Sequence, residues 1–200
     1  MDYTAIAVVE RIEPVVCGFD HLHWMRTEER LPDEWVVRRL ERVPLGTAYT
    51  RVVARLAELA QHPRLRGDCE MVVDATGVGA PVIDMLQAER VECKVTPVVL
   101  TAGANENFDG KAWRTPKMDV LARLQMLIEQ RRLRVSRKVR EAAALKRELL
   151  DVKAKQKPGG RMRIGADAAG QHDDLVMAVA LGVWMRGGRK KAGLMGKRVL

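Results

Sequence analysis

Residues 71–84, MVVDATGVGAPVID, place a carboxylate where a glycine-rich turn would otherwise receive a phosphate. The apolar run ends in Asp74, and Gly77 and Gly79 follow before a helical pattern begins. A strand, a glycine turn and a helix in that order are typical of an α/β sheet, in which ligands bind at the carboxyl ends of the strands. The stretch therefore predicts a site at Asp74.

Two phosphate-binding motifs do not fit this turn. It lacks the Gly-Lys-Ser/Thr ending of a nucleoside triphosphate loop. Val82 stands where a dinucleotide-binding fingerprint has its third glycine, and Asp74 would repel a pyrophosphate laid on the turn. Magnesium takes a few carboxylates and keeps several waters, which leaves room for phosphate oxygens. A metal site is the remaining interpretation.

A second group of acids precedes the last apolar segment. Asp173 and Asp174 lie in GQHDDLVMAVAL, residues 170–181. Adjacent acids at a helix start are ordinary caps, favoured by the helix dipole. Because the helix after them is almost wholly apolar and must pack on the sheet, at least one carboxylate is expected near the strand ends. Two divalent ions bridged by such acids can activate a water and stabilise the leaving oxygen of a phosphodiester.

Composition is consistent with one domain, or one domain with an appendage, in a chain of 200 residues that is 47% apolar. The net charge of +9 favours a polyanionic partner such as nucleic acid, and a soluble basic protein is the plainer alternative. Three scattered cysteines without CxxC spacing indicate neither a disulfide framework nor a zinc site. With no visible signal peptide and no apolar run of spanning length, we expect a cytoplasmic protein.

The order of the predicted elements indicates an α/β sheet, antiparallel at one edge and parallel in the middle. Residues 21–31 are predicted to pair with the opening strand, residues 3–12, after a turn near Gly18. Thr115 is predicted to cap a helix over residues 115–132, with Pro116 in its first turn. The other predicted strands are 69–75, 94–101, 151–157 and 161–166, and the other helices are 45–62, 79–89, 138–150 and 173–188. The stripe of the 115–132 helix is predicted to be Met118, Leu121, Leu124 and Ile128.

Residues 151–166 predict a hairpin with one basic face. A three-residue turn at 158–160 sets Lys155 opposite Arg163 and Lys157 opposite Arg161. Like charges directly opposite each other cost stability, so the pattern fits a face covered by DNA phosphates. A solvated edge protected by lysines remains the alternative. The candidate DNA-binding residues are Lys153, Lys155, Lys157, Arg161 and Arg163, with Lys117 as a further candidate that equally fits a solvated helix face.

Several blocks together resemble the nuclease domain of bacteriophage terminase large subunits. In chain order they are residues 2–11, 40–56, 72–86, 113–135, 145–155 and 170–184, so the resemblance covers about residues 2 to 186. It implies a ribonuclease-H-like fold with a two-metal carboxylate centre, using Mg²⁺ or Mn²⁺, that cuts concatemeric viral DNA during packaging. By motif match Asp74 is the second family acid, and Asp174 or its neighbour Asp173 is the third.

The chain departs from the family pattern in two places. The large subunit carries an ATPase motor before its nuclease, and family nucleases open with a central strand that ends in a first catalytic Asp. Here the sequence starts at Met1, Asp2 and Tyr3. We therefore expect an N-terminally truncated nuclease domain over residues 1–186, with its first central strand missing, and a flexible basic tail over 187–200.

The missing acid leaves three functions open. The first is a terminase-type endonuclease that is weak or inactive as this chain alone. The second is a DNA- or portal-binding remnant without catalysis, and the third is another ribonuclease-H-like nuclease, such as a resolvase or transposase. The long loop over 101–117 and the block at 40–47 argue against the third. The partners implied by the resemblance are double-stranded DNA, portal, the small terminase subunit and a separate ATPase motor chain or domain, in the host cytoplasm.

Overall fold

The computed structural model describes residues 3–20, 22–77, 79–156, 162–165, 173–187 and 198–199. The helices are α1 (Tyr49–Ala60), α2 (Gly79–Ala88), α3 (Lys117–Glu129), α4 (Ala142–Asp151) and α5 (Asp174–Gly187). The first strands are β1 (Thr4–Ile12), β2 (Val15–Asp20), β3 (Met25–Arg30), β4 (Glu34–Val43), β5 (Cys69–Asp74) and β6 (Lys94–Thr101). The later strands are β7 (Asn107–Phe108), β8 (Trp113–Pro116), β9 (Leu133–Val135), β10 (Lys153–Gln156), β11 (Met162–Gly165) and β12 (Arg198–Val199).

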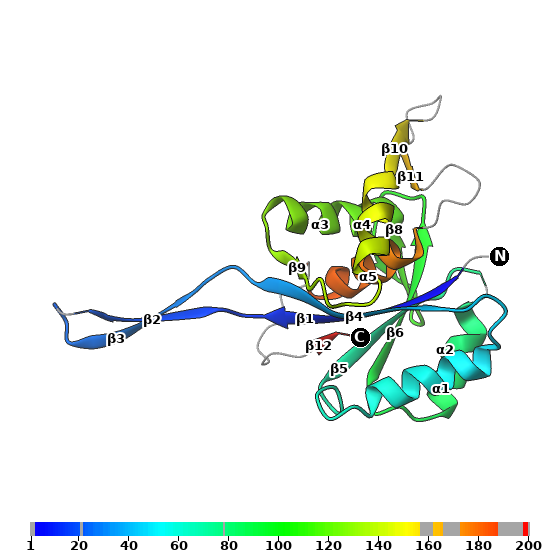
Figure 1. The fold of residues 1–200 in the computed structure, drawn as a ribbon, viewed down its shortest axis with the longest axis horizontal. Coiled ribbons are helices and arrows are strands. Elements are labelled where there is room, and N and C mark those ends of the chain that lie inside the picture. Colours follow the sequence, from blue (N-terminus) through cyan, green and yellow to red (C-terminus); the bar gives the residue numbers. More distant parts are fainter. Residues whose placement is uncertain are drawn as a thin grey trace.

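One mixed sheet organises the molecule (Figure 1). Its strand order is β7-β8-β6-β5-β12-β1-β4-β9. The β8-β6-β5-β12 block is parallel, β1 runs antiparallel to both of its neighbours, and β7 is an antiparallel edge. The predicted α/β sheet, parallel in the middle with an antiparallel edge, is confirmed, and it brings the carboxyl ends of β5 and β6 to one rim.

Helices cover both faces of this sheet. Alternate residues of β1 point to opposite faces, as the two-residue period of a strand requires. Ile6 and Val8 pack into the clusters that contain α1 and α2, whereas Ala7 and Val9 pack on the side of α3, α4 and α5. Helix α5 is apolar almost all round because it lies between α3, α4 and the sheet. None of the described helices is both long and apolar enough to cross a membrane.

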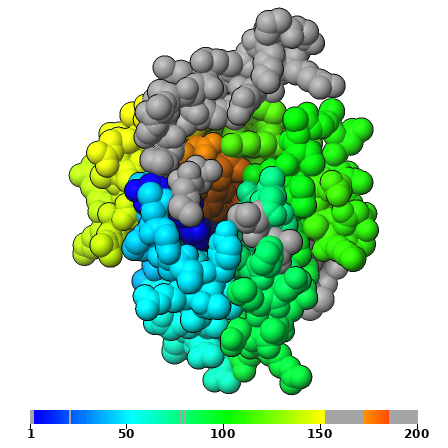
Figure 2. Space-filling view, turned by 90° about the vertical axis from the view of Figure 1, so that its right-hand side faces the viewer, coloured from blue at the N-terminus to red at the C-terminus, as the bar shows by residue number. Residues whose placement is uncertain are grey.

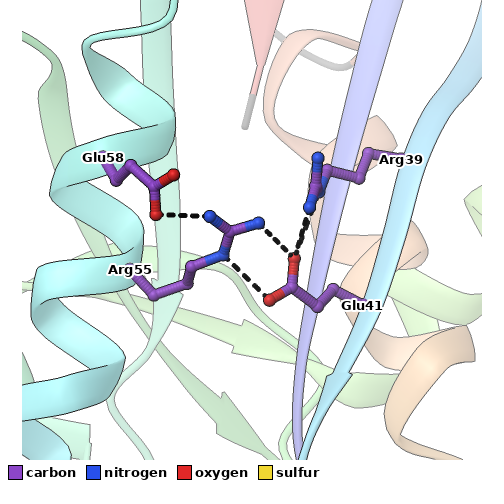
Figure 3. Close-up of polar contacts among 4 residues, drawn as sticks. All are labelled: Arg39, Glu41, Arg55 and Glu58. Atoms are coloured by element: carbon purple, nitrogen blue, oxygen red, sulfur yellow. Dashed lines mark hydrogen bonds and ion pairs between the residues drawn. The ribbon is translucent and has the colours of Figure 1, made fainter.

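An ion-pair network fastens α1 to β4 (Figure 3). The guanidinium of Arg55 on α1 donates from Nε and Nη2 to the two carboxylate oxygens of Glu41, each at 2.9 Å, and also pairs with Glu58. Arg39 donates to the same Glu41 from the strand side. The hydrogen bonds from Arg55 hold the pKa of Glu41 below its usual range. The side of α1 that faces the sheet edge is thereby held by charge as well as by apolar packing.

The predicted partner of the opening strand is wrong. β1 pairs with β4 along its whole length, from Thr4 opposite Val43 to Ile12 opposite Glu34. The intervening residues form β2 and β3, a separate two-stranded sheet that extends as an arm away from the body (Figure 1). The arm turns between β2 and β3, where Asp20 accepts the backbone N–H groups of two residues of the turn, 22 and 23.

The start and the buried face of α3 also differ from the prediction. Thr115 does not cap the helix, because it lies buried in β8, and α3 begins at Lys117 with no side-chain cap. Leu121 and Leu124 are buried as predicted, but Ile128 is 40% exposed. The buried set is Val120, Leu121, Leu124 and Leu127, which packs on the α5 side of the core.

A two-residue strand lies in the middle of the sheet, between β5 and β1. In β12, Arg198 and Val199 pair in parallel with Cys69 and Glu70, and Val199 also lies opposite Val9 of β1. No other described residue pairs with this side of β1, so most of the predicted central gap remains. Both residues of β12 fall in the segment predicted to be a flexible tail. Residues 188–197 and 200 lie outside the described part of the chain, so for them the tail stays a prediction.

Candidate functional site

A cleft of about 390 Å³ opens where β1 and β5 are not joined by a strand. Its walls come from the first residues of β1, the carboxyl end of β5, α1 and the starts of α2, α3 and α5. In Figure 2 the orange α5 lies deep in this face, between the dark-blue start of β1, the cyan α1 and the green segments. Its charged lining consists of Asp74, Lys117, Asp173 and Asp174.

Asp74 is the last residue of β5 and stands at the exposed rim of the cleft. Its Oδ1 accepts the backbone N–H of Thr76 at 2.8 Å, which orients the carboxylate. Thr76 in turn accepts the N–H of Leu100 through Oγ1 at 2.9 Å, so the turn after β5 is tied to β6. The strand and this turn together hold one carboxylate in a defined position.

The backbone of the same turn packs directly on Asp74. A Cβ atom built at Gly79 would lie 2.0 Å from the carbonyl oxygen of Asp74, so no side chain fits without moving the acid. Gly77 differs, because its φ is +66° but a Cβ there would meet nothing within 4 Å. The two glycines therefore serve different needs: close approach at one, and left-handed backbone at the other.

We expect Gly79→Ala to cost about 3 kcal/mol of unfolding free energy, the upper end of the overpacking range. Gly77→Ala should cost about 1–2 kcal/mol, from backbone strain alone. Urea denaturation measures both. The prediction fails if the two variants lose the same stability, or if Gly79→Ala is as stable as the wild type.

The second pair of acids lies where α5 begins. The carbonyl of Asp173 accepts the N–H of Met177 at 2.8 Å, and Asp174 is the first helical residue. Asp173 Oδ2 lies 2.7 Å from Nζ of Lys117, at the start of α3. Both side chains are about one-third exposed or less. Lys117, for which the sequence left a solvated face open, therefore lies in the cleft wall and pairs with a candidate metal ligand.

Glu148 supports the site, although no sequence motif pointed to it. This residue lies on the buried side of α4, and its Oε2 accepts the N–H groups of Leu175 and Val176 at 2.9 and 3.1 Å. Its other oxygen pairs with Arg42 of β4. Burial raises the pKa of Glu148. The hydrogen bond from Val176 and the charge of Arg42 lower it, but by less. The available signal in the sequence was its spacing: Glu148 lies three residues after Leu145, and so on the same, buried face of the helix.

Glu148 thus fixes the first turn of α5 next to the acids of the cleft. It accepts two N–H groups that a helix start leaves without intrahelical partners. The charge of Asp174 also contributes to the raised pKa of Glu148, because the two carboxyl groups are close enough to repel. The position of Asp174 consequently depends on a residue far away in the sequence.

Comparison with solved structures finds the same architecture in phage nucleases. The large terminase nuclease of thermophilic phage G20c superposes with a TM-score of 0.57 at 20% identity, over 90% of this chain and 81% of that one. The chain has the fold of a phage large terminase nuclease. The same G20c nuclease solved with bound magnesium gives a TM-score of 0.55 at 20% identity, over 90% of this chain and 82% of that one. The large terminase nuclease domain of Thermus phage P74-26 superposes with a TM-score of 0.50 at 19% identity, over 90% of this chain and 77% of that one.

The terminase nuclease fold is a ribonuclease-H-like α/β fold, as the motif resemblance predicted. No family model matches the sequence. No curated protein sequence is significantly similar to it. At this identity the likeness establishes the fold alone, and the roles of individual residues rest on the geometry of the cleft.

The basic hairpin of this terminase nuclease fold has the predicted register. Lys155 lies opposite Arg163, and Lys153 opposite Gly165, between β10 and β11. The pairing that would set Lys157 opposite Arg161 lies outside the described residues. The three-residue turn at 158–160 also lies outside the described residues, and DNA binding by the hairpin stays a prediction.

Carboxylates in the cleft suit a hard divalent ion. Among the described residues, no group of three or more histidine, cysteine or acidic side chains is placed to hold one metal. Magnesium is commonly held by one or two carboxylates with waters and phosphate oxygens, so a site completed by substrate phosphate does not need such a group. Asp74, Asp173 and Asp174 line the same cleft, and their role as metal ligands stays a prediction.

Proposed function

We propose that this chain is the metal-dependent endonuclease domain of a phage DNA-packaging terminase large subunit, acting on concatemeric double-stranded DNA. One observation carries the proposal. Asp74 and Asp174, far apart in the sequence, line one open cleft in a fold shared with terminase nucleases. An acid at the carboxyl end of a strand and another at the start of a helix, lining one open cleft, support phosphoryl chemistry rather than dinucleotide binding.

The side chains that line the cleft have different proposed roles. Asp74 and Asp174 are the proposed holders of two Mg²⁺ or Mn²⁺ ions, with Asp173 as the additional carboxylate. When bound, such ions supply water activation and stabilise the charge of the leaving oxygen. Lys117 offsets the negative charge of Asp173 at 2.7 Å, and this reduces repulsion among the acids before DNA enters. The glycine turn after Asp74 keeps bulky side chains away from an approaching backbone.

The wall made by β1 offers no carboxylate among the described residues. The residues that line the cleft there are Tyr3, Thr4, Ala5, Ile6 and Ala7. Without a carboxylate on this wall fewer ligands are available for two ions, so we infer that this chain alone cuts DNA weakly. Portal, the small terminase subunit and a separate ATPase motor are the proposed partners in packaging.

Calorimetric titration with Mn²⁺ tests the proposal against a non-catalytic DNA- or portal-binding role. We expect binding to the wild type and its loss in Asp74→Ala, because that carboxylate is a direct ligand. Asp84→Ala is the matched control, since this exposed acid of α2 lies outside the cleft lining and its removal changes the net charge equally. Absence of Mn²⁺ binding by the wild type, or equal loss in both variants, would favour the binding role.

A further inference from the structure

Five exposed cations cluster between β9 and the end of α4. The turn after β9 carries Arg137, Lys138 and Arg140, and the outer face of α4 carries Lys146 and Arg147. We call these five residues the basic ridge. Residues 136–147 contain these five cations and a single acid, Glu141. The whole chain, by comparison, has 35 basic and 26 acidic residues. The positive charge is therefore concentrated here rather than spread evenly.

None of the five side chains of the basic ridge forms an ion pair with any residue that the structure describes. Several arginines elsewhere in the chain do contact a carboxylate: Arg11, Arg38, Arg39, Arg55, Arg66, Arg114 and Arg134. Neighbouring like charges with no counter-charge repel one another, and an external polyanion would relieve that repulsion.

The inner face of α4 connects the basic ridge to the cleft. Glu148 accepts the N–H groups that start α5, beside Asp174, and pairs with Arg42. Arg42 lies over the ring of Tyr3, 5.2 Å from its centroid, and Tyr3 lines the cleft. In Figure 2 the yellow residues of α4 form the left flank of the face that holds the cleft.

The composition of the basic ridge favours nucleic acid over protein. Protein interfaces concentrate tyrosine, tryptophan and phenylalanine at their centres. None of these three residue types occurs between Trp113 and Trp184, so neither α4 nor the turn before it offers an aromatic anchor. Cations without aromatic neighbours bind the phosphate backbone through charge, and such contacts do not distinguish one base from another.

We propose that the basic ridge binds the phosphate backbone of duplex DNA on one side of the cleft. This proposal rests on the proposed function, from which it takes DNA as the partner. It adds the path of the duplex across the protein surface. The ridge thus holds the duplex to one side of the phosphodiester in the cleft.

Fluorescence anisotropy with a labelled duplex of about 30 base pairs, in EDTA and over a series of KCl concentrations, tests this. The variant is Lys146→Gln with Arg147→Gln, which keeps two good helix formers in α4. We expect the slope of log K against log salt to become shallower by about 1.8, at about 0.9 for each phosphate that the variant no longer neutralises. The control is Arg26→Gln with Arg30→Gln on the remote arm, which removes the same charge and should leave the slope unchanged.

Each outcome decides the proposal. A shallower slope only in the ridge variant supports it. Equal changes in both variants would show an effect of net charge alone, and no change in the ridge variant would show that DNA lies elsewhere; either result overturns it. Polyglutamate that binds the wild type more tightly than the duplex would overturn it in favour of an acidic protein. Because the assay contains no metal, failure of Mn²⁺ binding would refute the nuclease function without altering these results.

Discussion

Plasmid nicking in the presence of Mn²⁺ should fall about a hundredfold or more when Asp74 is replaced by alanine. Removing a carboxylate that holds an ion costs several kcal/mol of charge stabilisation at the phosphodiester, and each 1.36 kcal/mol is a factor of about ten in rate. We expect Asp174→Ala to have a similar effect, because both acids line the cleft. The wild-type rate itself should be low, so the assay needs long incubation and supercoiled substrate.

Asp84→Ala is again the control for this experiment and should nick at the wild-type rate. Circular dichroism of each variant separates loss of the site from loss of the fold. Robust wild-type nicking that Asp74→Ala abolishes would refute the inferred weakness and keep the site. Nicking that persists in Asp74→Ala and Asp174→Ala would remove both residues from the proposed centre.

Glu148→Ala should lower the free energy of unfolding by about 3–5 kcal/mol, as is usual when one member of a buried ion pair is removed. The side chain of Glu148 is only 7% exposed and that of Arg42 23%, so solvent replaces little of what the wild-type carboxylate supplies. The variant leaves the Arg42 charge without its carboxylate and two N–H groups of α5 without an acceptor. Urea unfolding measures the loss of stability.

Lys146→Ala, on the exposed face of the same helix, is the matched control and should change stability by less than about 0.5 kcal/mol. A loss below about 1 kcal/mol in Glu148→Ala would show that α5 does not depend on this interaction. If Mn²⁺ affinity falls with stability in the variant that still folds, Glu148 also positions Asp174.

The pH dependence of stability gives a separate test of Glu148. Burial raises its pKa in the folded protein above the unfolded value. Its contribution to stability is therefore greatest below the unfolded pKa, and falls as pH rises through the raised folded pKa. Glu148→Gln has no proton to lose, so its stability curve should lack this fall. If the curves of stability against pH were parallel for the wild type and Glu148→Gln, the raised pKa of Glu148 would be contradicted.

Local patterns predicted the elements whose determinants lie close together in the sequence. The stripe of α1 is an example. Helical spacing predicts that Val52, Val53, Leu56, Leu59 and Ala60 share one face, and all of them are buried except Leu56, which is half-buried. The register of the basic hairpin followed from its turn length and its alternation of charge. Asp74 was found because a carboxylate at a strand end, before glycines, is chemically unusual.

Features that depend on distant partners escaped prediction. β4 was missed because its arginines and Glu41 do not alternate cleanly with apolar residues, and its strand character comes from pairing with β1. Glu148 looked like any charged residue of an amphipathic helix until the start of α5 was placed against it. β12 has only two residues, too few for any periodicity.

The position of β12 restricts where a tag or label can be attached to the protein. Val199 pairs with the innermost strands, and Tyr3 lines the cleft. An affinity tag or fluorophore fused at either terminus would therefore emerge beside the sheet centre or the cleft. Leu22, 89% exposed at the tip of the arm, marks a more neutral attachment point for immobilising or labelling the molecule.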